Sequence, residues 1–219
     1  MAVALVGTIH GERGLATVES LLDILARFSP TAVYAEVPAS YISRYSDGSH
    51  GTLESQAVAQ YAREREVAVI PVDAPEPGPD FWAHDEFLWT RIENTSPEYR
   101  RIFDLHSAST KAGGFRYLNS PECLAAWDAL YSEAADTVVW LRDSSLSAIF
   151  AEWQRVIAHR DDTMLANILE HRARSDDTKG MLLVGSSHRQ ALLKKAAAFR
   201  DAGQASVQWD IGSFLSAVG

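Results

Sequence analysis

Two copies of a Gly-x-x-His pattern, near opposite ends of the chain, carry the side chains best suited to chemistry. The pairs are Gly7 with His10 and Gly185 with His188. Each glycine directly follows a short apolar run, residues 3–6 in the first copy and 181–184 in the second. Such a run is typical of a buried strand. One match of this length is weak evidence, but two matches in the same context indicate a shared structural reason.

The chemistry of these residues depends on where the two strands lie. If they are neighbours in a parallel sheet, His10 and His188 face one another beyond the carboxyl ends of the strands, where ligand sites form. Glu36 ends another apolar run and can join them. Two histidines and a carboxylate suit a divalent transition metal, Mn, Co or Zn, with open positions for water and substrate. The same side chains can also act without metal, with one neutral imidazole as general base.

The elements around these motifs predict an α/β fold with a mostly parallel central sheet flanked by helices. Short apolar runs alternate with segments whose apolar residues recur at helical spacing, which is the pattern of strand–helix–strand units. The expected strands are 3–6, 33–37, 67–72, 181–184 and 205–211, and the expected helices between them are 14–27, 53–65 and 189–201. We therefore expect residues 1–219 to form a single α/β domain.

A large helical insertion is expected within this domain, at residues 81–174. The proline-rich stretch 71–79 ends the strand–helix pattern. No buried strand follows until residue 181, and the block holds five of the six tryptophans. We expect these rings mainly to pack helices together, with one or two lining a substrate groove. Helices are predicted at 85–93, 98–110, 121–141 and 145–174, with a break near Asp143.

Composition excludes several classes of protein. The 219 residues carry a net charge of −9, which argues against binding the phosphate backbone of nucleic acid. No apolar run approaches the roughly 20 residues of a membrane helix, and we expect no signal peptide before the first strand. The single cysteine, Cys123, cannot form an internal disulfide. We expect a cytoplasmic protein that acts on a peptide or small molecule.

The ordered motifs resemble the TraB/PrgY/GumN family, which includes the TIKI proteases, and more remotely the erythromycin-esterase and ChaN-like proteins. The resemblance spans the chain as a series of short motifs. It rests on Gly7, His10, Glu36, Gly185 and His188, together with a helical segment that begins at Arg160 and reaches Met164. Asp161 stands where the family usually has asparagine, which removes an amide donor and adds a charge.

The resemblance implies an erythromycin-esterase/ChaN-like fold and metal-dependent hydrolysis, typically of peptides. His10, Glu36 and His188 would hold the metal or the attacking water, and Arg160 would stabilise the oxyanion. The aromatic insertion would form one wall of the substrate cleft. Some family members regulate or bind without turnover, so the resemblance does not by itself imply hydrolysis.

Four further residues are candidates for substrate binding, and each also has an ordinary structural explanation. Asp73 ends the third predicted strand, and Glu12 lies where an acid favours a helix start. Ser186 and Ser187 lie inside the second motif but outside any Gly-x-Ser-x-Gly elbow, so we expect them to line a pocket rather than act as nucleophiles. Three hypotheses remain: a metallopeptidase, a metal-independent esterase-like hydrolase with a histidine base, and a non-catalytic peptide or ligand binder.

Overall fold

A computed structural model describes residues 2–175 and 179–215 and contains a five-stranded sheet in which all pairings are parallel. The strands are β1 (Val3–Thr8), β2 (Ala32–Ala35), β3 (Ala68–Pro71), β4 (Gly180–Gly185) and β5 (Trp209–Asp210). Their order across the sheet is β3-β2-β4-β1-β5. The strands of the two Gly-x-x-His motifs, β1 and β4, are therefore neighbours, as the chemistry requires. The last strand was predicted at 205–211 but has two residues.

The predicted windows 53–65, 121–141, 145–174 and 189–201 agree with the structure within one residue, whereas the windows 85–93 and 98–110 are too short. The first of these two helices already begins at Pro79, because proline is favoured in the first turn of a helix. The helices are α1 (Val18–Phe28), α2 (Ile42–Asp47), α3 (Leu53–Glu64), α4 (Pro79–Thr95), α5 (Pro97–Leu118), α6 (Pro121–Leu141), α7 (Ser144–Arg174) and α8 (Arg189–Asp201). Helix α1 begins later than predicted because Thr17 caps it, with its hydroxyl accepting from the Ser20 amide. Helix α2 was not predicted. It follows a short 3₁₀ turn, Ala39–Tyr41.

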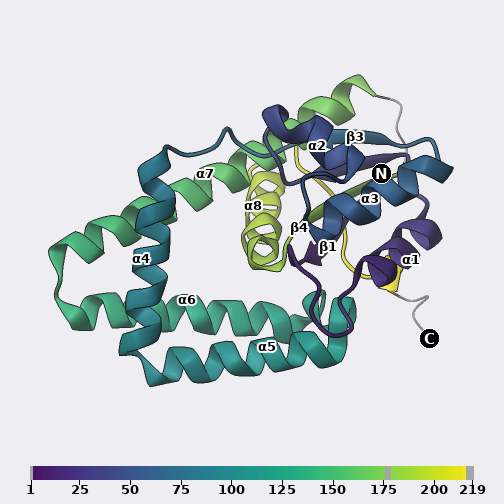
Figure 1. The fold of residues 1–219 in the computed structure, drawn as a ribbon. Helices are drawn as coiled ribbons and strands as arrows, with labels where there is room; N and C mark the ends of the chain where they lie inside the picture. Colours follow the sequence, from purple (N-terminus) through teal and green to yellow (C-terminus); the bar gives the residue numbers. More distant parts are fainter. Residues whose placement is uncertain (1, 176–178, 216–219) are drawn as a thin grey trace.

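Helices cover both faces of the sheet (Figure 1). Helices α1 and α3 pack on one face, against alternate buried residues such as Val6 and Val33. The C-terminal half of α7 and helix α8 pack on the other face, where Leu5 and Leu182 meet Met164 and Leu192. Every residue of β1 and β2 is buried, which explains why these strands read as unbroken apolar runs.

The four helices α4 to α7 follow one another between β3 and β4, and α4, α5, α6 and the first half of α7 stand beside the sheet in Figure 1. They share a core of their own that includes Leu88, Leu130 and Phe150. Ser96, Ser120 and Asp143 cap the starts of α5, α6 and α7, so the expected break near Asp143 is confirmed. The segment is not separate from the sheet, because α7 continues onto its face.

Buried polar contacts fasten the end of α5 to strand β1. The side-chain oxygen of Asn119 accepts from the Gly7 amide at 2.7 Å, and its amide group donates to the Gly7 carbonyl at 3.1 Å. The guanidinium of Arg189, which is fully buried, donates to the carbonyls of Leu118 and Asn119. These bonds hold the helices against the strand that leads to the first motif. Within the described part of the chain, no helix has the length and apolar character to cross a membrane.

Candidate active site

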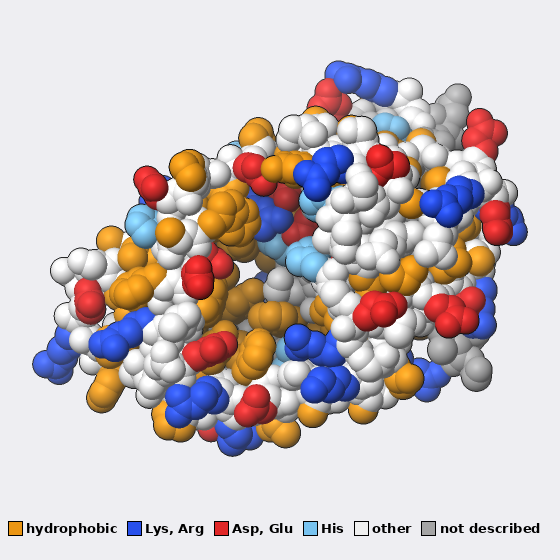
Figure 2. Space-filling view, viewed as in Figure 1, with side chains coloured by type: hydrophobic (Ala, Val, Ile, Leu, Met, Phe, Trp, Pro, Cys, Tyr) orange, Lys and Arg blue, Asp and Glu red, His pale blue; other side chains and the backbone are white. Residues whose placement is uncertain are grey.

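The carboxyl ends of the strands open into a cleft. Thr8 lies opposite Gly185 in the pairing of β1 with β4, and Ala35 lies opposite Leu183 and Pro71 on its two sides, so four strands end at one edge. Figure 2 shows this edge as a hollow, with charged and histidine side chains gathered at its base and hydrophobic side chains along the side toward the helices.

The cleft has two lobes that meet at a shared set of residues. The smaller lobe, of about 190 Å³, extends over α2 and the loop after β3. The larger lobe, of about 350 Å³, extends under α4 to α7. Both lobes are lined by His10, Glu36, Trp82 and Arg160. A molecule that spans the cleft therefore passes three of the predicted site residues at its centre.

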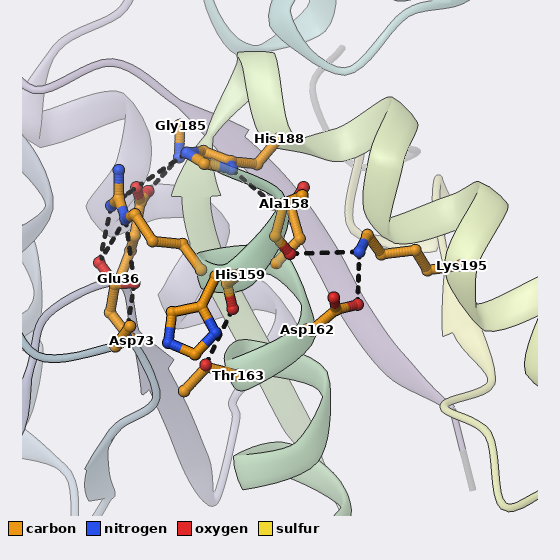
Figure 3. Close-up of polar contacts among 12 residues, drawn as sticks. Glu36, Asp73, Ala158, His159, Asp162, Thr163, Gly185, His188 and Lys195 are labelled. Atoms are coloured by element: carbon orange, nitrogen blue, oxygen red, sulfur yellow. Dashed lines mark hydrogen bonds and ion pairs between the residues drawn. The ribbon is translucent and has the colours of Figure 1, made fainter. Parts of the chain in front are cut away.

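Glu36, the first residue after β2, is the centre of a buried network (Figure 3). Its Oε1 atom accepts from Arg160 Nη2 at 2.7 Å and lies 3.3 Å from His188 Nε2. Its Oε2 atom accepts from the backbone amide of Gly185 at 2.6 Å. Burial alone raises the pKa of Glu36, but the charge and hydrogen bond of His188 and the charge of Arg160 outweigh it and hold the pKa well below its usual range. The carboxyl is therefore ionised.

His188 is buried between two carboxylates. It ends the 3₁₀ turn Ser186–His188 after β4, and its Nδ1 atom lies 2.6 Å from Asp161 Oδ1 while Nε2 faces Glu36. Burial lowers the pKa of His188, but the two carboxylates outweigh it and raise the pKa to about 9. The imidazole is therefore protonated at neutral pH and donates on both sides. Asp161 on α7 is its second partner.

Arg160 connects the network to the third strand. It lies on α7, and its Nε and Nη2 atoms donate to the carboxylate of Asp73, which follows β3. Burial lowers the pKa of Arg160, but the hydrogen bond to Asp73 and the charge of Glu36 outweigh it and raise the pKa further. Asp73, predicted as a substrate-binding residue, instead has its carboxylate bound to Arg160 while lining the smaller lobe.

His10 has a different environment, because it lies in the loop between β1 and α1 and its side chain is 66% exposed. Its Nδ1 atom lies 3.3 Å from Oε1 of Glu54, which also accepts from the Thr8 hydroxyl at 2.5 Å. The bond to Glu54 outweighs burial and raises the pKa of His10 to about 9. Sequence reasoning missed Glu54. It occupies the first turn of α3, where an acid is ordinary, so no local pattern marks it.

The larger lobe is mostly aromatic. Four tryptophans line it, which is more than the one or two expected, and they belong to α4, α6 and α7. Its apolar lining is Phe81, Trp82, Trp89, Tyr99, Phe103, Trp127, Tyr131, Trp153 and Ile157. The rings contact one another, with Trp153 edge-on to Trp89 at 5.0 Å between centroids. Asp85 accepts from the Trp89 indole at 2.9 Å and fixes its orientation.

The predicted metal ligands lie near one another but do not form a donor set. Both oxygens of Glu36 accept hydrogen bonds from the protein, and both ring nitrogens of His188 face carboxylates. A protonated imidazole has no lone pair for a metal. Over residues 2–175 and 179–215, no group of three His, Cys, Asp or Glu side chains is placed to hold a metal ion. In this arrangement the residues do not fit the expected cation.

Two other candidates, Glu12 and Ser186, have structural roles, and a third, Ser187, lines the cleft. Glu12 lies outside both lobes and accepts from the Val18 amide at the start of α1. Ser186 is buried, and its hydroxyl accepts from the Trp127 indole at 3.0 Å. Ser187 lines the larger lobe beside Tyr131, to which it hydrogen-bonds. Ser187 is thus the one serine of the motif positioned to touch a bound molecule.

No protein-family model matches the chain. No curated protein and no solved structure matches it.

Proposed function

We propose that this protein is a metal-independent hydrolase of esters or amides that uses His10 as its general base. The observation that carries the proposal is the pair formed by His10 and Glu54 at the junction of the two lobes. A carboxylate on one ring nitrogen fixes the tautomer and orientation of an imidazole, which leaves the other nitrogen to take a proton. His10 Nε2 has no hydrogen bond within the described residues, and it is this atom that would face an attacking water.

The reaction step follows from this geometry. Neutral His10 takes a proton at Nε2 from a water molecule as the water oxygen bonds to the substrate carbonyl carbon. The same proton then passes to the leaving alcohol or amine as the carbonyl bond to it breaks. Because Glu54 raises the pKa of His10 to about 9, the neutral base is a minor form at pH 7, and the rate should rise with pH up to about 9.

Arg160 is suited to stabilise the oxyanion. Glu36 and Asp73 engage its Nε and Nη2 atoms, so the guanidinium is held rigidly at the wall of both lobes. Its Nη1 atom makes no hydrogen bond to the described residues. A fixed donor that requires no rearrangement during the reaction is the arrangement that stabilises developing negative charge most effectively.

The larger lobe indicates the kind of substrate. A cavity of about 350 Å³ lined by aromatic rings favours an apolar or aromatic group over a charged one. The reacting carbonyl would lie at the junction of the lobes, and the apolar group of the substrate would lie in the larger lobe under α4 to α7. This group can belong to a small ester or to an aromatic residue of a peptide.

The test is turnover of p-nitrophenyl esters and p-nitroanilides with aromatic acyl groups. Wild type is compared with His10→Ala and with His159→Ala, a control at an exposed histidine on α7. Turnover that resists a chelator, rises toward pH 9 and falls at least about 100-fold in His10→Ala supports the proposal. Turnover that needs added Mn²⁺, Co²⁺ or Zn²⁺ overturns it in favour of the metallopeptidase. Binding without any turnover overturns it in favour of the non-catalytic binder.

A further inference from the structure

Two residues that line the smaller lobe each carry a buried polar atom that has no partner among the described residues. Tyr45 and Glu54 line this lobe and are 3% and 4% exposed, yet the Tyr45 hydroxyl and Glu54 Oε2 make no hydrogen bond to the described residues. A buried polar atom left unpaired destabilises the folded protein. A ligand group that hydrogen-bonds these atoms would offset that destabilisation.

The charged residues that line the smaller lobe indicate which charge a bound ligand group should carry. Its described lining includes four carboxylates and two cationic groups. The carboxylates are Glu36, Glu54, Asp73 and Glu76, and the cationic groups are Arg160 and protonated His10. Glu36 and Asp73 are bound to Arg160, whereas Glu54 has one oxygen shared by His10 and Thr8 and the other unpaired. The excess negative charge favours a cation that can donate hydrogen bonds.

The walls of the lobe point to an organic ammonium rather than a metal ion. Tyr41, Tyr45, His50 and Trp82 line it, and the His50 ring lies 5.6 Å from Tyr41 and 6.2 Å from Tyr45. Aromatic faces attract ammonium groups and pack against the carbons that carry them. A metal ion would need several oxygen or nitrogen ligands around one point, and no such group is placed there among the residues that the structure covers.

We propose that the smaller lobe binds a protonated amine of the substrate, which rests on the proposed function of the same cleft. The ammonium donates to Glu54 Oε2 and to the hydroxyl oxygen of Tyr45. Because the lobes meet at His10, Glu36 and Arg160, the amine lies on one side of the reacting carbonyl and the apolar group on the other. The substrate class is an amine-bearing ester or amide with an aromatic or bulky apolar group.

Calorimetric binding of two matched probes tests this without turnover. Phenethylamine carries the ammonium and an aromatic ring, and 2-phenylethanol replaces the ammonium by a hydroxyl. At pH 7 we expect the amine to bind at least about tenfold more tightly, since a hydrogen bond between charged groups is stronger than one between neutral groups. Glu54→Gln should remove this preference, and Tyr45→Phe should weaken amine binding several-fold. Tyr61→Phe, at a buried tyrosine outside the lobe, should change neither.

The outcomes separate this inference from the proposed function. Equal affinity for the two probes overturns the amine site, even if the protein hydrolyses esters. A preference for the amine that survives in both Glu54→Gln and Tyr45→Phe also overturns it, and circular dichroism confirms that each variant is folded. Amine preference lost in these variants, in a protein that hydrolyses none of the esters or anilides, supports the amine site and overturns the hydrolase.

Discussion

The two Gly-x-x-His units share a sequence pattern and a sheet edge but place their histidines in different environments. In the second unit the chain turns directly through Ser186–His188 into α8, so His188 is buried within the fold. In the first unit the chain continues through a loop before α1 begins at Val18, so His10 stays mostly exposed in the cleft. The length of chain between the strand and the next helix therefore decides which histidine is enclosed.

The carboxylate partners differ in the same way. His188 lies between Glu36 and Asp161, and its positive charge compensates both buried carboxylates. His10 has one partner, Glu54, and its other ring nitrogen is left for a reacting molecule. One motif thus provides a structural cation and the other a group suited to proton transfer. In this chain the duplicated motif therefore specifies a position at the sheet edge rather than a chemical role.

Replacing each histidine by alanine should give the largest difference in stability between the two units. His188→Ala leaves Glu36 and Asp161 buried without their shared cation, and breaking a buried pair in this way costs about 3–5 kcal/mol. His10→Ala removes an exposed partner while Glu54 keeps its bond from Thr8, so it should cost about 1 kcal/mol or less. Urea unfolding at pH 7 measures both values.

Two further variants sharpen this prediction. Asp161→Ala combined with His188→Ala should cost less than the sum of the single changes, because the buried charge left by one change is removed by the other. His159→Ala, at an exposed position on the same helix, should stay within about 0.5 kcal/mol. Equal losses of stability in His10→Ala and His188→Ala would contradict the division of roles.

Much of this site could be predicted because parallel strands end at a common edge. The adjacency of β1 and β4 was a condition of the predicted site, and the structure meets it. The approach of Glu36 to His188 then follows from apolar runs that each end near a polar residue. The starts of α5, α6 and α7 were predictable from serine, proline and aspartate, whereas the start of α4 at Pro79 was missed. Such helix starts are local features, so the sequence around each one is sufficient.

The rest could not be predicted, because it depends on contacts between distant segments. Glu54 begins a helix far along the chain from His10, and only the packing of α3 brings the two together. The pairing of Asp161 with His188 depends on how α7 lies across the sheet. The predicted metal set remains a prediction, and it did not anticipate that Arg160 and the Gly185 amide bind the Glu36 oxygens.

The pH dependence of stability should distinguish the two histidines next. Both pKa values lie near 9 in the folded state and above the ordinary 6.5, so the folded state binds more protons. Their stabilisation is complete below about pH 6.5 and is lost as the pH rises through about 9. For buried His188 the loss amounts to about 3 kcal/mol, and for exposed His10 it is smaller because solvent screens it.

Urea unfolding at pH 6.5 and pH 9.5 checks this. The free energy of unfolding should fall by about 3 kcal/mol in wild type. Most of the fall should disappear in His188→Ala and persist in His10→Ala. A fall that is unchanged in His188→Ala would mean that this histidine is already neutral in the folded protein, and its assigned role as a structural cation would then fail.

Replacing each motif glycine by alanine should give the smallest changes in stability, and the two changes should differ clearly from one another. A Cβ added at Gly7 would lie 2.4 Å from Arg189 Cδ and 2.9 Å from the Leu118 carbonyl oxygen. Arg189 is fully buried and held by two backbone carbonyls, so it cannot move aside freely. Gly7→Ala should therefore cost about 1–3 kcal/mol by overpacking.

For Gly185→Ala we expect the opposite result, namely no loss of stability. A Cβ there would meet Glu36 Oε2 at 3.5 Å and His188 at 3.7 Å, which are ordinary contacts, and its backbone φ of −48° suits alanine. The amide that donates to Glu36 is unchanged by the substitution. Thermal unfolding of Gly185→Ala should match wild type within about 0.5 kcal/mol. A loss as large as that of Gly7→Ala would show that the second glycine, like the first, is required by close packing, and the two units would then share more than their position at the sheet edge.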